Sequence, residues 1–301
     1  MTAIWTRPVA ALALMGALTA LLPACGSSVV DQLEPTRILS VGDGMADVGQ
    51  NGYQFTVNDG SRNWTQILAA NFGLTLSAAS AGGWSYAQGH ARVERADATS
   101  GLNAPSVKNQ IDALLARIVF EEKDLVLVGG GLDDIVDAVT ATGISDATTQ
   151  TVRAAGRALG AQVRRLVEAG APYVVVSGVY NLGHSPWARE RGQAGDIERL
   201  STAFNDALLL SITDLSQHVL YVDAALFFNL IYNNQYTVSN VDDPACTTPT
   251  AATCTPETIV AGASYGSYMF ADKLYFTPGV QGLFANDGYD QNAYTRIRDR
   301  W

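Results

Sequence analysis

Several carboxylates in this sequence stand where they could do chemistry. Asp43, Asp133 and Asp134 each come shortly after a short apolar run, and Asp272 lies near the C-terminal end. If those runs are parallel strands, their carboxyl ends share one edge of a sheet, and ligands bind at that edge. We therefore expect the four carboxylates to converge. Oxygen ligands in such a cluster would suit a hard cation such as Ca²⁺.

A structural role is also open to these carboxylates. Asp43 can accept backbone N–H groups of its own turn, Asp134 can cap the helix that follows it, and Asp272 can accept a bond from Tyr275. Carboxylates that cluster without a cation raise one another's pKa. We favour the structural role, and we expect neither a bound metal nor a cofactor.

A hydrolytic nucleophile needs a base within hydrogen-bond reach, and the chain has three histidines. His184 lies in the loop Asn181–Pro186 and is a candidate pocket residue, although an ordinary loop histidine is the simpler interpretation because only geometry would make it a base. His218 precedes an apolar run, which favours a structural role. His90 is a candidate to fill or line a pocket.

The elements that would position these residues alternate along the chain. Short runs rich in β-branched residues predict strands at Arg37–Val41, Thr75–Ala79, Leu125–Val128, Tyr173–Ser177 and Val219–Val222, of which only the second is not strongly apolar. Helical spacing is found at Trp64–Phe72, Val107–Arg117, Thr148–Glu168, Ile197–Leu215 and Gly279–Arg300, the last interrupted around Gly288. This alternation is typical of an α/β protein with a parallel sheet covered on both faces.

The loops after the strands, together with a C-terminal motif, resemble in order and spacing the blocks of the SGNH/GDSL hydrolase family. The matching segments are Gly42–Gly49, Gly82–Arg92, Gly129–Asp134, Asn181–Pro186 and Phe270–Pro278. The resemblance covers almost the whole chain after its N-terminal segment. It implies a three-layer α/β/α, flavodoxin-like fold with about five parallel strands.

Members of this family hydrolyse esters with a serine nucleophile in Gly-Asp-Ser-Leu and an Asp-x-x-His pair near the C-terminus. Carried over to this sequence, the nucleophile falls on Gly44, the Asp on Asp272 and the His on Tyr275. Glycine has no side chain that could attack a substrate. An unperturbed phenol is protonated at neutral pH and is a poor proton acceptor.

The family's oxyanion hole is completed by a Gly and an Asn. The Gly falls on His90, with Gly82 and Gly83 as alternatives, and the Asn falls on Asp133. An ionised carboxylate accepts hydrogen bonds and repels an oxyanion, whereas an amide would donate to it.

These replacements predict a catalytically inactive protein of this fold with a ligand-binding or envelope-interaction role. The losses are not additive, because the residues of such a site act as one unit. A small molecule, an acyl chain or a glycan is the expected class of ligand. The alternative is an ester hydrolase, esterase- or lipase-like, with weak or atypical activity.

The N-terminal segment has the features of a secretory signal. Arg7 precedes an apolar run over 9–22, and Leu22-Pro23-Ala24-Cys25 resembles a bacterial lipobox. We predict a signal peptide over 1–24, a lipidated Cys25 with a tether over 25–36, and a single domain over 37–301. Plain secretion without lipidation is the alternative. A diacylated cysteine would anchor the exported protein in the bacterial cell envelope, in the periplasm or at the outer membrane.

The other two cysteines, Cys246 and Cys254, lie close together in a stretch, 238–262, that lacks regular periodicity. An exported protein meets an oxidising environment, so we predict a local disulfide and an exposed loop. A zinc site would need more cysteine or histidine nearby than this stretch contains.

The net charge of −10 at pH 7 limits the partners of this protein. Without a basic cluster, nucleic acid is excluded as a partner, and attraction to anionic lipid head groups would be weak. The membrane is therefore expected as a partner only through the lipid anchor.

Overall fold

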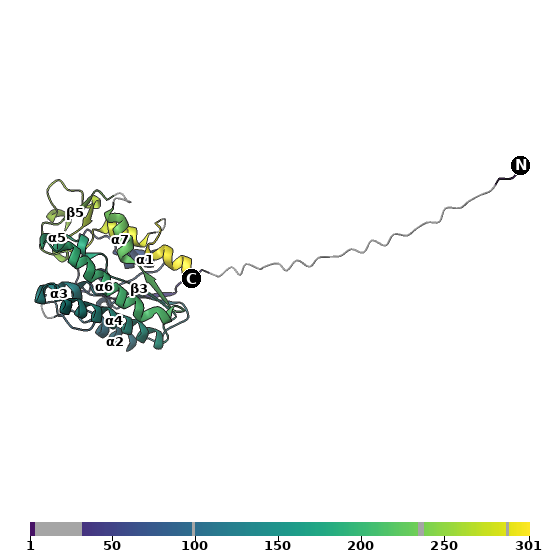
Figure 1. Ribbon diagram of the computed structural model, residues 1–301, viewed down its shortest axis with the longest axis horizontal. Coiled ribbons are helices and arrows are strands. Elements are labelled where there is room, and N and C mark those ends of the chain that lie inside the picture. Colours follow the sequence, from purple (N-terminus) through teal and green to yellow (C-terminus); the bar gives the residue numbers. More distant parts are fainter. Residues whose placement is uncertain (4–31, 98–99, 234–237, 287–288) are drawn as a thin grey trace. The chain divides into compact units, whose positions relative to one another are not determined.

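The structure is a computed structural model that describes residues 1–3, 32–97, 100–233, 238–286 and 289–301 (Figure 1). Residues Gln32–Trp301 form one compact unit. The predicted lipidation site at Cys25 and the predicted helix interruption at Gly288 lie outside the described residues.

A parallel sheet forms the centre of this unit. Its strands lie in the order β1-β2-β3-β4. They are β1 (Arg37–Val41), β2 (Asp124–Val128), β3 (Tyr173–Ser177) and β4 (Val219–Val222). Leu39 of β1 pairs with Val126 of β2, and Val176 of β3 pairs with Tyr221 of β4. Most of the strand side chains are buried, as expected for a sheet covered on both faces, so four of the five predicted strands are confirmed.

The fifth predicted strand, Thr75–Ala79, is wrong. Next to β1 the chain makes only isolated bridges, which pair Ser85 with Ser40 and with Ala78. The amide of Ser40 donates to the carbonyl of Trp84 over 3.1 Å, so the segment after the Gly82-Gly83 turn takes the edge position. The predicted segment contains few large apolar side chains to bury, and it ends in a 3₁₀ turn at Ala79–Ala81.

Helices cover both faces of the sheet, and the predicted three-layer α/β/α arrangement is confirmed (Figure 1). One layer contains α2, α4 and α6, and α3 packs against α4 in it. The other contains α1, α7, α8 and α9, joined by rings such as Phe227 and Phe284 at 5.2 Å. The helices are α1 (Trp64–Asn71), α2 (Val107–Leu115), α3 (Leu132–Thr142), α4 (Asp146–Glu168), α5 (Pro186–Glu190), α6 (Ala194–Ile212), α7 (Ala224–Tyr232), α8 (Pro278–Ala285) and α9 (Ala293–Arg300).

Local signals explain where several helices begin. The side chain of Asn63 accepts from the backbone of Thr65 and Gln66 and caps α1, and Ser145 caps α4 in the same way through Thr148. The predicted closing helix is two helices, α8 and α9. Periodicity did not predict α3 or α7, which both begin within a few residues of the strand before them.

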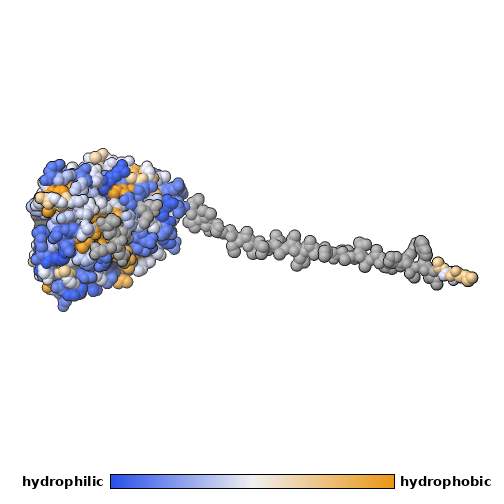
Figure 2. All heavy atoms as spheres, turned by 90° about the horizontal axis from the view of Figure 1, so that it is seen from above, coloured by the Kyte–Doolittle hydropathy of each residue, from blue (hydrophilic) through white to orange (hydrophobic). Residues whose placement is uncertain are grey.

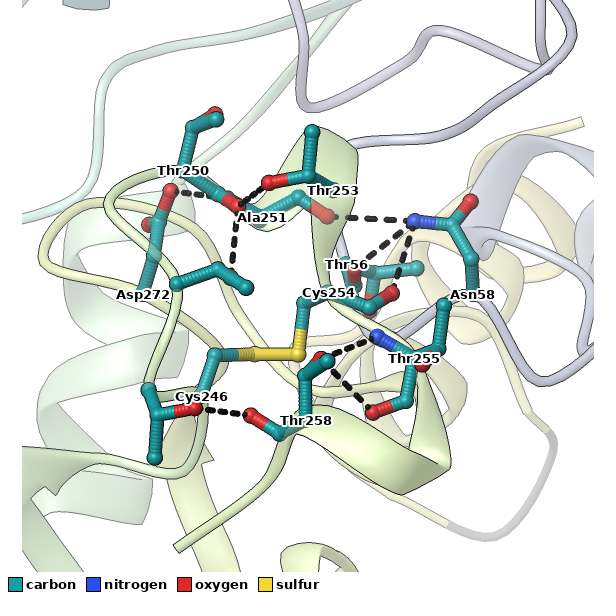
Figure 3. Close-up of a disulfide and its surroundings, with 12 residues drawn as sticks. Thr56, Asn58, Cys246, Thr250, Ala251, Thr253, Cys254, Thr255, Thr258 and Asp272 are labelled. Atoms are coloured by element: carbon teal, nitrogen blue, oxygen red, sulfur yellow. Dashed lines mark hydrogen bonds between the residues drawn. A yellow bond between two sulfur atoms is a disulfide. The ribbon is translucent and has the colours of Figure 1, made fainter.

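The stretch with the two cysteines is more ordered than predicted. It contains β5 (Asn240–Pro244), which pairs in parallel with β6 (Tyr268–Phe270) to form a second, two-stranded sheet. The predicted disulfide between Cys246 and Cys254 is confirmed, and both cysteines are buried (Figure 3). Its loop is tied to a distant part of the chain, because Asn58 Nδ2 donates to the carbonyls of Ala251 and Cys254 (Figure 3).

Removal of this disulfide is expected to destabilise the folded unit. Replacing Cys246 and Cys254 together by Ala should lower the free energy of unfolding by about 2–3 kcal/mol, because the bridge restricts the unfolded chain. Chemical denaturation measures the loss. The unchanged protein in reducing buffer should lose a similar amount, whereas the double variant should be insensitive to the reductant. Equal stability of the oxidised protein and the variant would contradict the prediction.

On the face seen in Figure 2, hydrophilic residues predominate and hydrophobic ones form small, separate patches. Among the residues that the structure describes, no helix is both long and apolar enough to cross a bilayer.

Candidate functional site

The loop after β1 carries the position of the family nucleophile. Both backbone polar groups of its first residue, Gly42, are hydrogen-bonded to the buried amide of Gln110. The Gln110 amide donates to the Gly42 carbonyl over 2.9 Å and accepts from the Gly42 N–H over 2.8 Å. Asp43 is buried and accepts the N–H of Met45 over 3.0 Å. This carboxylate therefore has the predicted structural role of holding its own turn.

Asp47 connects this loop to the loop that carries His90. One of its oxygens accepts the N–H groups of Gly49 and Gln50, and the other accepts the N–H of Gly89 over 2.9 Å. Asp47 is buried, so these bonds are protected from water. The loops after β1 and around Gly89 are consequently held together by one carboxylate.

Tyr275 fills the space beside Gly44. A Cβ atom built on Gly44 would lie 2.7 Å from both Cε1 and Oη of Tyr275 and 2.8 Å from its Cζ. Such distances are shorter than any ordinary carbon contact. The aromatic ring at the family's histidine position therefore occupies the volume that a serine side chain would need.

Tyr275 is fixed in this place by aromatic packing. Its ring centroid lies 5.0 Å from that of Phe55, and only 2% of Tyr275 is exposed. Its Oη makes no hydrogen bond with the described residues. Burial, followed by the nearby charges of Asp133 and Asp43, raises the pKa of Tyr275 well above 10. The phenol is therefore neutral and cannot serve as a base at physiological pH.

His90 and Asp133, the two positions assigned to the oxyanion hole, lie next to each other. Nδ1 of His90 is 3.6 Å from Oδ1 of Asp133, and this carboxylate raises the pKa of His90. His90 has a left-handed backbone with φ 65°, and its ring packs edge-on against Phe55 at 5.4 Å. The other oxygen, Oδ2 of Asp133, is buried without a partner among the described residues.

Asp272, which matches the acid of the triad in the resemblance described above, accepts backbone N–H groups with both of its oxygens. Its Oδ1 accepts the N–H groups of Leu274 and Tyr275 over 2.8 and 2.7 Å. Its Oδ2 accepts the N–H of Ala251, inside the disulfide loop, over 2.6 Å (Figure 3). Burial raises its pKa. Asp272 thus joins the Tyr275 turn to the disulfide loop.

Asp43 and Asp134 are two carboxyls whose pKa is raised into the neutral range. Burial, followed by the charge of Asp133, raises the pKa of Asp43 to about 7. Burial also raises the pKa of Asp134 to about 7, although its Oδ2 accepts the N–H of Val93 over 2.9 Å. The predicted helix-capping role of Asp134 is not seen, since α3 begins after Gly131 without a side-chain cap.

His184 has its contacts in another part of the unit. Its ring stacks on Tyr232 with centroids 3.7 Å apart and planes 10° from parallel, and Nε2 is 3.4 Å from Nδ2 of Asn181. Burial lowers its pKa. The contacts of His184 thus differ from those around Gly44, which involve Tyr275, Phe55 and His90.

A narrow apolar cavity lies at the carboxyl ends of the strands, with Asp43 in its wall. Aromatic and aliphatic side chains such as Trp64, Tyr180, Phe228 and Phe284 line it. Its volume is about 30 Å³. Ligand pockets are typically about 300–1,000 Å³, so this cavity is too small for a substrate.

At the positions that match the family's motifs, this site has a glycine in place of the serine and a tyrosine in place of the histidine. Gly44, Asp133, Asp272, Tyr275 and His90 are gathered at one edge of the sheet by the contacts given above. Within the described residues, no group of three or more His, Cys, Asp or Glu side chains is arranged to hold a metal ion. The cluster offers hydrogen-bond acceptors and a neutral phenol, and neither is a nucleophile paired with a base.

Sequence analysis did not identify Phe55 and Asp47 as part of this site. Phe55 packs so closely over Gly89 that a Cβ there would lie 1.8 Å from the ring, which explains the glycine. No motif in the sequence marks Phe55. The Asp47-x-Gly49 spacing is a turn signal that could have indicated the local bonds of Asp47, but not its bond with Gly89.

The sequence matches no family profile and no curated protein significantly. Solved structures are similar at low identity. An aryl esterase from M. smegmatis is similar over 88% of this chain and 98% of its own, with 16% identity and a TM-score of 0.46. An extracellular lipase from Streptomyces rimosus is similar over 88% of this chain and 100% of its own, with 16% identity and a TM-score of 0.44. A lipolytic G-D-S-L family protein from Veillonella parvula is similar over 68% of this chain and 87% of its own, with 11% identity and a TM-score of 0.43.

Proposed function

We propose that this chain is a catalytically inactive, lipid-anchored protein of the SGNH/GDSL hydrolase fold with a binding role in the bacterial envelope. The observation that carries this proposal is the contact between Gly44 and Tyr275. A missing nucleophile alone could be compensated by a substrate hydroxyl or a water molecule. Here the space for the nucleophile is also taken, because Tyr275 packs against the glycine.

The remaining positions support the same conclusion. Acyl transfer needs a proton acceptor beside the nucleophile and donors aimed at the oxyanion. Tyr275 stays protonated because its pKa is raised, and both oxygens of Asp272 are occupied by backbone N–H groups. The carboxylate of Asp133 stands where the family has a donating amide.

An esterase assay tests this proposal. The purified mature chain is expected to hydrolyse p-nitrophenyl acetate no faster than a preparation from cells with an empty vector. An active esterase of the same fold, purified in the same way, is the positive control. Saturable turnover well above the blank that is lost on substitution of a residue near Gly44 would instead establish an ester hydrolase with an atypical nucleophile.

The anchor can be tested separately from the chemistry. Cys25→Ala should move the protein from the membrane fraction to the soluble fraction, because the diacylated thiol supplies the membrane affinity. Fractionation of cells that express each form measures the shift. Substituting the neighbouring Ser27 by Ala is the control and should leave the protein in the membrane. A Cys25→Ala form that stays with the membrane would contradict lipidation.

The binding role requires a cavity larger than the one beneath the loop after β1. That cavity, at about 30 Å³, holds little more than a water molecule or two. A hollow of about 360 Å³ lies between the loop 92–95 and helices α3 and α4, and this volume is within the range of small-molecule sites.

A further inference from the structure

The hollow beside α3 and α4 has a floor made of small side chains. Both helices contribute alanines to it, at Ala138 and Ala141 from α3 and at Ala154, Ala155 and Ala158 from α4. Small side chains leave the space between the two helices open. The floor suits a short aliphatic chain, which would be removed from water on binding.

Ionic side chains surround this floor. Arg92, Glu94 and Arg95 come from the loop, and Asp134 and Asp137 come from α3. The lining residues from α4 include no charged side chain. Three carboxyl groups and two guanidinium groups therefore line the hollow.

The guanidinium of Arg92 has other partners than Asp134. Its Nη1 donates to Asp137 and its Nη2 donates to the carbonyl of Ala96. These two bonds use two of the five N–H donors of the guanidinium, and neither goes to Asp134. Arg92 is therefore the ion-pair partner of Asp137, and among the described residues it forms no direct ion pair with Asp134.

Asp134 projects into the hollow from the first turn of α3. Its Oδ2 accepts the N–H of Val93, which accounts for one of its two oxygens. No lysine, arginine or histidine of the described ranges lies within ion-pair distance of it. A carboxylate in this setting is costly to ionise unless a cation comes to it.

We infer that the hollow between the loop 92–95 and helices α3 and α4 binds a primary alkylammonium ion, with Asp134 as its counter-ion and the alanine floor under its chain. The ammonium group would donate to the free oxygen of Asp134. The inference specifies the ligand of the proposed binding role and rests on that role. It does not depend on the inactivity of the positions around Gly44, because none of them lines the hollow.

Binding should strengthen as Asp134 becomes ionised. On its own helix Asp134 is faced by Asp133 and Asp137, both of which disfavour its charge, and from the loop by Arg92, which favours it. Glu94 and Arg95 also line the hollow. Since burial raises the pKa of Asp134 to about 7, the alkylammonium should bind at least tenfold more tightly at pH 8 than at pH 5.5.

Calorimetric titration of the mature chain with n-butylammonium chloride at pH 8 tests the inference. The Cys25→Ala form is used so that the protein is not acylated. We expect saturable binding at one site, at least tenfold weaker binding to Asp134→Asn, and unchanged binding to Asp146→Asn, whose exposed carboxylate lies at the start of α4. 1-Butanol, which has nearly the same chain without the charge, should bind at least tenfold more weakly than the amine.

A second variant, Ala155→Phe, tests the same site in case Asp134→Asn does not fold. Ala155→Phe places a large ring in the hollow, leaves Asp134 unchanged, and should also weaken amine binding at least tenfold. The inference is overturned if butanol and butylammonium bind equally, if neither variant weakens binding, or if the amine does not bind at all. The ester assay is independent. Turnover of p-nitrophenyl acetate together with amine binding would refute the inactivity and leave the amine site standing.

Discussion

The folded unit is expected to become less stable as the pH rises from 5 to 8. Asp43 and Asp134 have a pKa of about 7 in the folded protein, against 3.8 ordinarily. Between these values the folded protein keeps protons that the unfolded chain has released, so raising the pH favours unfolding. The two units between pH 5 and this folded pKa correspond to roughly 3 kcal/mol for each group, and the melting temperature should fall by roughly 10 °C.

Other groups modify this trend without reversing it. His90 also has a raised pKa, so the stability that it contributes at low pH is lost as the pH rises through that value. His184 has a lowered pKa and acts in the opposite direction. Asp112 and Asp214 have lowered pKa values, and the stability that they contribute is lost only well below pH 5.

Thermal denaturation between pH 5 and 8 measures this dependence. Asp43→Asn and Asp134→Asn should each weaken the dependence of the melting temperature on pH. The difference in melting temperature from the unchanged protein should be largest at pH 8, where these carboxylates are ionised. Asp146→Asn, at an exposed position, should leave the slope as it is. A melting temperature that rises steadily toward pH 8 would show that these two carboxyls are not held protonated by the fold.

Introducing the family's nucleophile should destabilise the protein. In Gly44→Ser the new Cβ would collide with three atoms of Tyr275, and the buried ring has no room to retreat. Overpacking of this kind costs about 1–3 kcal/mol. Urea denaturation measures the loss. Gly195→Ser is the matched control, because a Cβ on Gly195 meets nothing within 4 Å, and its effect should stay within about 0.5 kcal/mol.

A double-mutant cycle isolates the contact between these two positions. Tyr275→Ala is itself costly, since it leaves a cavity, but adding Gly44→Ser to it should cost less than about 0.5 kcal/mol. The coupling between the two substitutions should therefore exceed about 1 kcal/mol. Full additivity would mean that the serine side chain finds space without displacing Tyr275.

The same substitutions test whether the old site can be restored. The triple variant Gly44→Ser, Asp133→Asn and Tyr275→His returns a nucleophile, an oxyanion donor and a base to their family positions. It is expected to react with a fluorophosphonate probe, whereas the unchanged protein and Gly44→Ser alone should not. Failure of the folded triple variant to react would mean that the surrounding loops no longer hold the catalytic geometry.

Local sequence patterns were sufficient for much of the fold. The strands Arg37–Val41 and Tyr173–Ser177 were predicted to the residue, because a strand buried on both faces must be apolar throughout. The disulfide was predicted from the spacing of two cysteines together with the expected export of the chain. Order and spacing of motifs also predicted that Gly44, Asp133, Asp272 and Tyr275 share one edge of the sheet.

The features that the sequence did not predict share a physical cause. Thr75–Ala79 was predicted as a strand from its local sequence, but it does not pair with β1. Ser85 forms the bridge to β1 in its place. Nothing in the sequence marks Phe55, which lies beside both His90 and Tyr275. Pairing and packing of this kind join residues that are far apart in the chain, and periodicity does not report on such contacts.

The sequence by itself determined that the serine and the histidine of a family esterase are absent. It also determined the positions of the four strands of the central sheet, because their apolar residues are close neighbours in the chain. Only the tertiary structure decided that Tyr275 fills the space beside Gly44, that Asp272 accepts backbone N–H groups with both oxygens, and that Arg92 pairs with Asp137. These contacts depend on the volumes and directions of side chains from distant segments of the chain. Such side chains meet only when the folded chain packs them closely together.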